Sequence, residues 1–378
     1  MRFRVARDVL SEAIQWTARV VPNRPAVPIL AGVRLSADNG VLELASFDYE
    51  VSARSKVEVQ VDSPGEALVS GKLLAEIVRA LPNRDIAVTL VDNQLEIRCG
   101  NSEFTLPTMT LADYPQVPGL PKLVGTIDAG EFAVAINQVA TAASKEEALP
   151  LLTAVRLEID GPNLALLATD RYRLALREAA WQPTDPSFNA TLLVKSKVLV
   201  DVTKTMAAGG DIDIYLSDTD GGAQSSLIGF GAGGRQATSV LMDGDYPPVR
   251  KLFPDDTPLE YVCGRLELLE ATRRVSLVAE RKTSVRLSFE EGAVLLEAGQ
   301  GDNAQAHESV EIVSGSEDLK TAFNPQFLQE GLAAIEDDYV RFRCTSGSKA
   351  IVLQGQKERG GEPDDSYRYL LMPIRFGA

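Results

Sequence analysis

The feature that most constrains the fold is a pattern that occurs three times along the chain. The stretches "PILAGVRLSADNGVLELASFDYEVSA", from Pro28, and "PLLTAVRLEIDGPNLALLATDRYRLAL", from Pro150, share a proline, a Val-Arg-Leu triplet, two alternating strands and a following acid. A third copy, "SVRLSFEEGAVLLEAGQ", carries Val285-Arg286-Leu287. Repetition on this scale predicts one structural unit that is built three times.

The segments around each copy repeat as well. Apolar residues at helical spacing predict a helix before each copy, over 8–21, 130–144 and 266–280, and a helix after it, over 71–82, 196–206 and 324–335. Proline- and glycine-rich breaks lie at 112–121 and 244–254, and these two segments resemble each other. We therefore expect three domains, at 1–119, 120–250 and 251–378.

Each repeat reads as helix, strands, helix, strands, which predicts an α+β fold. Alternating strands bury one face of an antiparallel sheet, and two amphipathic helices can cover that face. Three such units can stand side by side and continue one another's sheet edges. Closure into a ring removes exposed edges, and a symmetric oligomer can supply it.

Composition excludes several classes of function. The net charge of −15 disfavours a tight, sequence-reading DNA binder. The single histidine, His307, argues against Ser-His-Asp and Cys-His hydrolases. Three widely spaced cysteines indicate packing thiols rather than disulfides or a zinc site, so we expect no metal and no cofactor.

The start of the chain argues against a signal peptide. We expect "MRFRVARDVLSEAIQW" to be an amphipathic helix, because it carries acids and lacks a long apolar region. Apolar runs in the chain fall short of the roughly 20 residues that span a membrane. These observations predict a cytoplasmic protein.

The repeat, the motif "ATDRYRLA", the boundary motif "DYPPV" and the terminal "LLMPIRF" together resemble the bacterial DNA polymerase III beta subunits, the sliding clamps. The resemblance covers the whole chain. It implies a head-to-tail homodimer of three-domain subunits closed around duplex DNA, with twelve helices lining the hole and the sheets outside. It also implies a processivity factor without catalysis of its own. The expected partners are the polymerase III alpha subunit, the clamp loader, and other polymerases and repair proteins.

The resemblance also implies a peptide-binding pocket between domains two and three. Short motifs of partner proteins would bind there through apolar anchors, with arginine and tyrosine at the lip. An alternative interpretation is a packed corner in which Asp170 pairs with Arg173. The expected pocket residues are Thr169, Arg171, Tyr172, Arg173, Leu174, Pro248, Val249, Leu370, Leu371, Met372, Pro373, Ile374 and Arg375.

Two further sets of residues follow from the resemblance. Basic residues on the helices roughly offset the acids there, which suits sequence-independent contact with phosphates but is equally typical of a solvated face. The DNA-binding candidates are Arg24, Arg79, Lys197 and Lys204. The dimer candidates are Phe104 and Leu106, which would face Leu277 of a second copy.

A second class of function is an acid–base enzyme that uses Asp48 and Asp170. These residues follow the same strand in the first and second repeats. An acid that recurs at one position of a repeated fold also suggests a structural cap.

Overall fold

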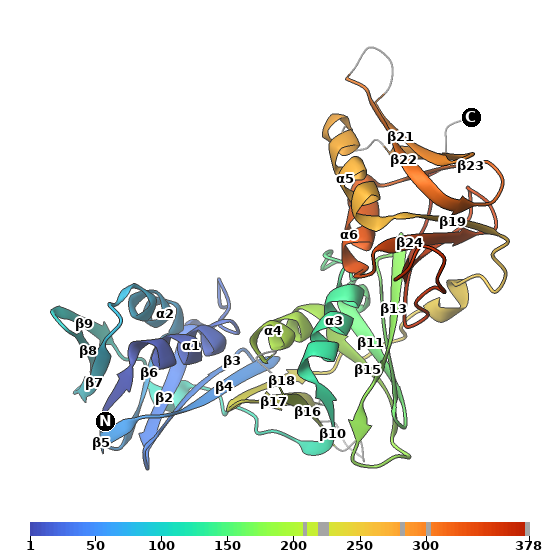
Figure 1. Cartoon of the computed structure of the whole chain (residues 1–378). Helices are drawn as coiled ribbons and strands as arrows, with labels where there is room; N and C mark the ends of the chain where they lie inside the picture. The colour runs from blue at the N-terminus through green and yellow to red at the C-terminus, as the bar shows by residue number, and fades with distance from the viewer. Residues whose placement is uncertain (207–209, 218–226, 280–283, 300–303, 375–378) are drawn as a thin grey trace. The chain divides into compact units, whose positions relative to one another are not determined.

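The computed structural model describes residues 1–206, 210–217, 227–279, 284–299 and 304–374 (Figure 1). Over these residues the chain forms two compact units. Unit 1 comprises 1–130, 182–185 and 197–241, and unit 2 comprises 131–181, 186–196 and 242–378. The second repeat is therefore shared between the units, because some of its strands join the sheet of the first repeat and others join the sheet of the third.

Unit 1 contains two antiparallel sheets, with strand orders β5-β1-β7-β8-β9 and β14-β10-β16-β17-β18-β4-β3-β2-β6. Its strands are β1 (Arg2–Ala6), β2 (Gly32–Asp38), β3 (Val41–Phe47), β4 (Val51–Glu58), β5 (Gln60–Ser63), β6 (Gly65–Ser70), β7 (Asp85–Val91), β8 (Gln94–Cys99), β9 (Ser102–Pro107), β10 (Lys122–Asp128), β14 (Gln182–Pro183), β16 (Asp211–Leu216), β17 (Leu227–Ala232) and β18 (Arg235–Val240). Its helices are α1 (Arg7–Ala18), α2 (Gly71–Ala80) and α4 (Ser196–Met206).

The start of the chain differs from the expected helix. Residues 2–6 form β1, and helix α1 begins only at Arg7. The alternating burial of Phe3 and Val5 explains the strand, because both side chains enter the core that α1 and α2 cover. The alternation of buried and exposed residues extends over only five residues, so the longer helical pattern that follows it dominated the sequence prediction.

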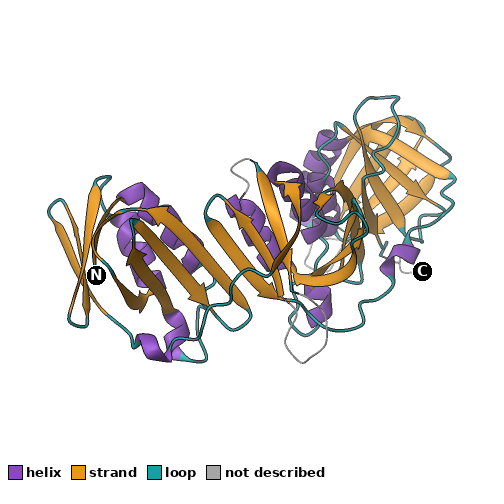
Figure 2. Ribbon diagram, turned by 90° about the horizontal axis from the view of Figure 1, so that it is seen from below, coloured by secondary structure: helices purple, strands orange, loops and turns teal. Residues whose placement is uncertain are grey.

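Unit 2 contains one continuous antiparallel array, in the order β15-β11-β12-β13-β26-β25-β24-β19-β22-β21-β20-β23. Figure 2 draws the strands of the protein in orange and its helices in purple. Its strands are β11 (Ala154–Asp160), β12 (Asn163–Thr169), β13 (Arg173–Ala180), β15 (Asn189–Lys195), β19 (Leu259–Gly264), β20 (Val285–Glu290), β21 (Ala293–Ala298), β22 (Ala306–Gly315), β23 (Leu319–Phe323), β24 (Tyr339–Cys344), β25 (Ile351–Gln356) and β26 (Tyr367–Leu371). Its helices are α3 (Ala129–Ala140), α5 (Arg265–Val275) and α6 (Pro325–Ala334).

Local sequence explains where α6 begins and how it packs. The side chain of Asn324 accepts hydrogen bonds from the backbone N–H groups of Gln326 and Phe327, and Pro325 occupies the first turn. A Cβ at Gly331 would lie 2.3 Å from the ring of Tyr369, so only glycine lets α6 approach β26 this closely. Helices α5 and α6 lie side by side (Figure 1).

Two equivalent strand pairs continue the sheets from one repeat to the next, as expected. β4 of the first repeat pairs with β18, the last strand of the second. β13 of the second repeat pairs in the same way with β26, the last strand of the third. The first and second repeats thus each receive the last strand of the repeat that follows.

Backbone hydrogen bonds fix the alignment of the three repeats. The N–H of Met109 donates to Leu68 at 2.8 Å, that of Met242 to Leu193 at 2.9 Å, and that of Ile374 to Ala322 at 2.8 Å. The three acceptors lie opposite Arg34, Arg156 and Arg286, the arginines of the Val-Arg-Leu triplets. Met109, Met242 and Ile374 are therefore equivalent positions, and β9, β18 and β26 are equivalent strands.

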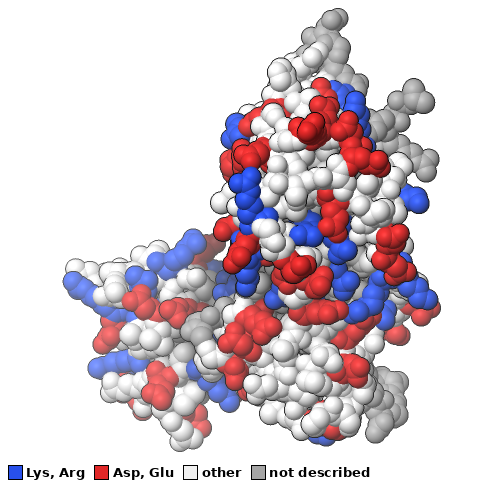
Figure 3. Space-filling view, turned by 45° about the vertical axis from the view of Figure 1, so that its right-hand side comes forward, with Lys and Arg blue, Asp and Glu red and all other residues white. Residues whose placement is uncertain are grey.

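The cysteines are buried thiols, as expected: Cys99, Cys263 and Cys344 are all free and buried. Burial raises the pKa of Cys263 to about 12 and that of Cys344 to about 11, which keeps both thiols protonated. On the face shown in Figure 3, acidic and basic side chains are interspersed rather than gathered into one patch.

Candidate functional site

The motif "ATDRYRLA" forms a tight corner between β12 and β13. The carboxylate of Asp170 accepts hydrogen bonds from the N–H groups of Tyr172, at 3.0 Å, and Arg173, at 3.1 Å. The hydroxyl of Thr169 donates to the carbonyl of Arg173 at 2.6 Å and accepts from the N–H of Arg171. Arg171 adopts a φ of 82°, a strained value for a residue other than glycine. The corner is held by its own side chains.

The buried side chain of Arg173 stabilises this corner. Its side chain is only 3% exposed and donates to Asp170 at 2.9 Å, to Tyr369 at 3.3 Å and to Glu330. Its guanidinium also lies 4.2 Å from the ring centre of Phe327. Burial lowers the pKa of Arg173, but these partners outweigh that effect and hold it above its usual value. Arg173 therefore belongs to the packed interior rather than to an open lip, as the alternative interpretation expected.

The other candidates divide into a buried floor and an exposed rim. Leu174, Val249 and Leu370 come from distant parts of the sequence and share one buried apolar cluster. Above the floor, the N–H of Met372 donates to the carbonyl of Tyr172 at 2.9 Å, which joins the C-terminal segment to the corner. The remaining candidates are Leu371, which is buried, Pro373, which is half-buried, Arg171, Pro248 and Ile374, which are exposed, and Arg375, which lies outside the described residues.

The rim presents adaptable and aromatic side chains to solvent. Met372 is 45% exposed and Tyr172 is 55% exposed. The Tyr172 ring stacks on the Phe327 ring, with centroids 6.2 Å apart. The guanidinium of Arg171 lies 5.6 Å from the centroid of the Tyr172 ring and forms an ion pair with Glu146. Such a surface can hold a short apolar peptide by a few anchors.

Sequence reasoning missed Phe327, Glu330 and Tyr369, which complete the corner. All three lie in the third repeat, more than a hundred residues from the motif. The string "NPQF" gave a usable signal, because an Asn cap followed by proline fixes the helix phase and thus the direction of Phe327. Without the strand pairing of β13 and β26, however, nothing brings that helix to the motif.

The first repeat contains an equivalent corner that differs in chemistry. Asp48 caps the N–H groups of Glu50 and Val51 at 3.0 and 2.7 Å, and Tyr49 has a φ of 76°. The N–H of Val240 donates to Glu50 as Met372 does to Tyr172. Asp48 and Asp170 are therefore matching structural caps, as one of the two interpretations expected.

The floor of the first-repeat corner is polar and already filled. Ser52, at the position of Leu174, hydrogen-bonds with Thr238 at 2.6 Å. Arg54, at the position of Leu176, donates to the carbonyl of Val117 at 2.7 Å. Of the two corners, only the second offers an apolar floor with a methionine at its rim.

The four DNA-binding candidates all lie in unit 1 and are exposed. Lys197 and Lys204 lie on α4, Arg79 lies near the end of α2, and Arg24 lies in the loop after α1. Lys72 holds that loop to α2 by donating to Pro22 and Asn23. Cationic side chains are thus presented by two helices and a tethered loop.

The dimer candidates lie in different environments. Leu106 is buried in the core of unit 1, so it supports the edge strand β9 without being available to a partner. Phe104, on the same strand, is 38% exposed. Leu277, just beyond α5, is 85% exposed. An apolar side chain this exposed suggests a surface that a partner covers.

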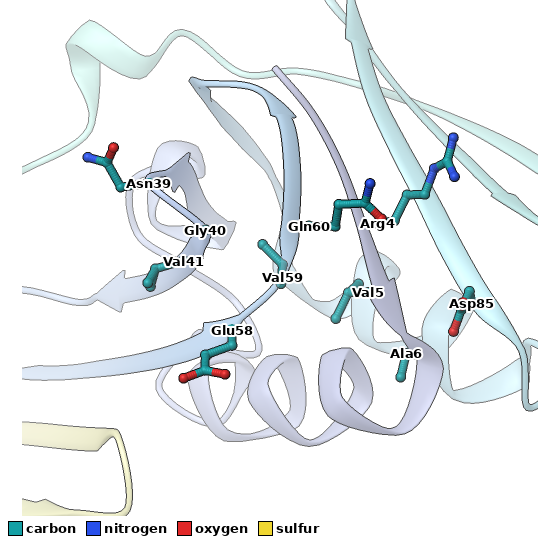
Figure 4. Close-up of a pocket in the computed structure, with 10 residues that line it drawn as sticks. All are labelled: Arg4, Val5, Ala6, Asn39, Gly40, Val41, Glu58, Val59, Gln60 and Asp85. Carbon is teal, nitrogen blue, oxygen red and sulfur yellow. The ribbon is translucent and has the colours of Figure 1, made fainter.

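Two surface pockets lack a set of unpaired polar side chains that point toward one another. One, of about 690 Å³, lies where the chain passes from β4 to β5 between the two sheets of unit 1; Figure 4 shows Glu58 and Arg4 pointing in different directions. The other, of about 560 Å³, lies over β11 to β13, where Arg250 already pairs with Glu158 and Glu178. Within the described residues, no cluster of His, Cys, Asp or Glu could hold a metal ion.

Curated relatives match most or all of the chain. A beta sliding clamp from Streptomyces coelicolor is 45% identical, with 100% of both chains covered. One from Micrococcus luteus is 49% identical over 82% of this chain and 98% of its own. A crystal structure of a sliding clamp, DNA polymerase III subunit beta, from Pseudomonas aeruginosa bound to griselimycin superposes with a TM-score of 0.90 at 26% identity, covering 100% of both chains.

Family models agree along the chain. Residues 1–118 match the N-terminal domain, 126–248 the central domain and 250–375 the C-terminal domain of the DNA polymerase III beta subunit. The α+β fold of three tandem clamp domains is thus the one that the repeat predicted. The chain belongs to the DNA polymerase III beta subunit family, the bacterial sliding clamps.

Proposed function

We propose that this chain is a DNA sliding clamp, a processivity factor that encircles duplex DNA and tethers the replicative polymerase to it. The observation that carries the proposal is the match of three consecutive clamp domains to relatives over the full length. The domains run over 1–119, 120–250 and 251–378. The clamp acts in the cytoplasm; among the described helices, none is long and apolar enough to cross a membrane.

The clamp has no catalysis of its own and serves as an accessory subunit. The acid–base enzyme, the alternative function, requires carboxylates that are free to exchange protons. Asp48 and Asp170 instead accept backbone hydrogen bonds at two equivalent turns, and Asp170 also pairs with Arg173. Their recurrence therefore supports structural caps rather than an active site.

A homodimer closes the ring by sheet continuation. β4 receives β18, and β13 receives β26. Among the described strands, however, the equivalent stretch of β22, residues 306–311, pairs with β21 alone. The strand equivalent to β18 and β26 is β9, an edge strand of unit 1. The third repeat of one copy would therefore receive β9 of a second copy, and the reciprocal pair would close a two-fold ring.

The proposed interface between β22 of one copy and β9 of the other, called the seam below, would bring exposed apolar residues together. Arg274 of α5 pairs with Glu308 of β22, so the end of α5, with Leu277, lies beside the open edge. Phe104 of the partner's β9 would lie on the same side. Leu277→Asp should give monomers, because an unpaired charge would be buried at the seam. Sedimentation velocity checks this, and a Leu277→Asp protein that still sediments as a dimer contradicts the seam.

Short peptide motifs of partner proteins bind at the second-repeat corner. The apolar floor of Leu174, Val249 and Leu370 with the rim of Tyr172 and Met372 supports this site. The proposed partners are the polymerase III alpha subunit, the clamp loader, and other polymerases and repair proteins. Peptides with a glutamine and a leucine- or phenylalanine-rich end should bind with affinities on the order of micromolar, as small transient interfaces do.

DNA contact is weak and independent of sequence. Arg24, Arg79, Lys197 and Lys204 are exposed and can approach phosphates, while the net charge of −15 opposes tight binding. Retention on DNA therefore comes from closure of the ring rather than from affinity.

A further inference from the structure

Part of the apolar floor at the second-repeat corner comes from a linker rather than from the sheet. Val249 begins η4 (Val249–Leu252), a single short turn between the second and third repeats, and its side chain is 6% exposed. The floor residues Leu174 and Leu370, in contrast, lie on the paired strands β13 and β26. One isolated turn is not stable by its own hydrogen bonds, so contacts with the sheet must fix its position.

Arg250, the second residue of η4, makes such a contact. Its guanidinium forms ion pairs with Glu158 of β11, at 3.3 Å, and with Glu178 of β13, at 3.5 Å. β12 lies between these two strands, and its residue opposite both glutamates is Ala165. The small side chain of Ala165 leaves the pocket of about 560 Å³ in which one guanidinium reaches both carboxylates. Arg250, Glu158 and Glu178 are called the Arg250 bridge below.

The Arg250 bridge lies next to the floor on the same face of the sheet. Because side chains alternate along a strand, Leu167 shares the face of Ala165, and Leu176 shares the face of Glu178. Ala165, Leu167 and Leu176 all belong to the apolar cluster that contains Val249. The ion pairs of Arg250 therefore fix where the neighbouring side chain of η4 enters that cluster.

Arg368 of β26 adds a contact at the other end of η4. Its guanidinium lies 3.4 Å from the carboxylate of Glu178 and 5.2 Å from the ring centre of Phe253, the residue that follows η4. The turn is thus held on both sides. Arg250 is 47% exposed and Glu178 is 50% exposed, so these ion pairs contribute little to the overall stability of unit 2.

The first repeat contains the same row of the sheet without such a bridge. Glu43 stands at the position of Ala165, because each lies opposite the residue that follows its Val-Arg-Leu triplet. Glu43 forms an ion pair with Lys56 of the next strand, at 3.5 Å. A residue of the sheet itself therefore occupies the place that Ala165 leaves open.

The two linkers differ in the same sense. The string "YPQVP" of the first linker aligns with "YPPVR" of the second, and Val117 and Val249 are both buried. Pro118, however, stands where the second linker has Arg250. Of these two linkers, whose residues the structure describes, only the second carries the bridge, and it is the one beside the apolar floor and the methionine rim.

We propose that Arg250 is a positioning residue for the peptide site: by bridging Glu158 and Glu178, it holds η4 where Val249 completes the floor before a peptide arrives. The inference rests on the proposed peptide site and adds the contact that prepares it. A site that is already in place avoids the cost of being ordered during binding. If η4 is in place for only a fraction of the time, the apparent affinity falls by that fraction.

The test compares the affinities of full-length wild type and Arg250→Gln for one uncharged peptide with a glutamine and a leucine-rich end. Calorimetry should show binding to Arg250→Gln that is about 3- to 5-fold weaker, because exposed ion pairs are individually weak. The urea unfolding midpoint should stay at the wild-type value. Arg359→Gln, which removes an exposed ion pair with Glu311 in the third repeat, is the matched control and should bind like wild type.

A double-mutant cycle separates positioning from direct contact. Glu158→Gln combined with Glu178→Gln should weaken peptide binding as Arg250→Gln does, and Arg250→Gln added to that protein should weaken it no further. An additional loss in the triple variant would mean that Arg250 contacts the peptide itself, which would overturn the positioning role.

Salt gives a second readout, because the peptide carries no charge. Between about 0.1 M and about 1 M sodium chloride the screening length falls from about 10 Å to about 3 Å. The advantage of wild type over Arg250→Gln should then fall below about twofold. An advantage that stays the same at high salt would exclude the ion pairs as its cause.

The inference and the proposed peptide site can fail separately. A wild-type protein that binds no such peptide overturns the site, and the role of Arg250 with it. A wild-type protein that binds the peptide, when Arg250→Gln binds it equally well, leaves the site intact and overturns only the role of Arg250.

Discussion

At the scale of single residues, the second-repeat corner separates stability from binding. Arg173 is buried among Asp170, Glu330 and Tyr369, whereas Met372 and Tyr172 face solvent. Substitution of the buried Arg173 should therefore change stability, whereas substitution of the exposed Met372 or Tyr172 should change the affinity for partner peptides.

Arg173→Ala should destabilise unit 2 by about 3 kcal/mol, because it leaves two carboxylates without their buried cation. Urea unfolding followed by tryptophan fluorescence checks this. The chain has one tryptophan in each unit, Trp16 and Trp181, so a Trp16→Phe background reports unit 2 alone. An unchanged unfolding midpoint would show that Arg173 does not brace the corner.

The ion pair should also be sensitive to acid. Burial raises the pKa of Glu330, but hydrogen bonds from Gln326 and Arg173 and the nearby charges outweigh it and hold the pKa below its usual value. The stabilisation is therefore present above the carboxyl's unfolded pKa, about 4.3, and is lost as pH falls through the lower folded value. Glu330→Gln should be less stable than wild type at pH 7, with a difference that shrinks below about pH 4. A constant difference across this range would contradict the assignment.

Met372→Ala should weaken the binding of a glutamine- and leucine-containing peptide about tenfold, because it removes an exposed apolar anchor. Val240→Ala, at the equivalent position of the first-repeat corner, is the matched control and should leave affinity unchanged. Calorimetry measures both. Equal affinities for wild type and Met372→Ala would indicate that the corner is only a packed joint.

At the scale of elements, the sequence predicted the repeated helices and strands well and their junctions poorly. Helix 196–206 was predicted to the residue because its apolar spacing is uninterrupted. The first strand was missed because five alternating residues run directly into α1. The caps at Asp48 and Asp170 could be inferred from recurrence alone.

The residues that complete the corner could not be predicted, for a physical reason. Phe327, Glu330 and Tyr369 reach Arg173 only because β26 pairs with β13, and register between distant strands leaves no local signal. Leu106 shows the converse. The family resemblance placed it at the dimer interface, but the inward face of β9 buries its side chain in the core of unit 1.

The C-terminal segment gives a prediction at this scale. Removal of residues 372–378 should abolish peptide binding, because Met372 and its hydrogen bond to Tyr172 are lost. The dimer should persist, because β9 and β22 are untouched. Sedimentation and calorimetry on the same preparation separate the two effects, and a deletion that binds peptide normally would exclude this segment from the site.

At the scale of the whole molecule, the central claim is that the protein holds DNA by encircling it. A net charge of −15 should make direct binding to phosphates weak, so the account assigns retention to the proposed ring. The most direct measurement loads the clamp onto a nicked circular duplex, cuts the circle once with a restriction enzyme, and follows the bound fraction by gel filtration. The account predicts that the clamp stays on the circle and is released after the cut. Equal retention on the circle and on linear DNA with free ends would contradict it.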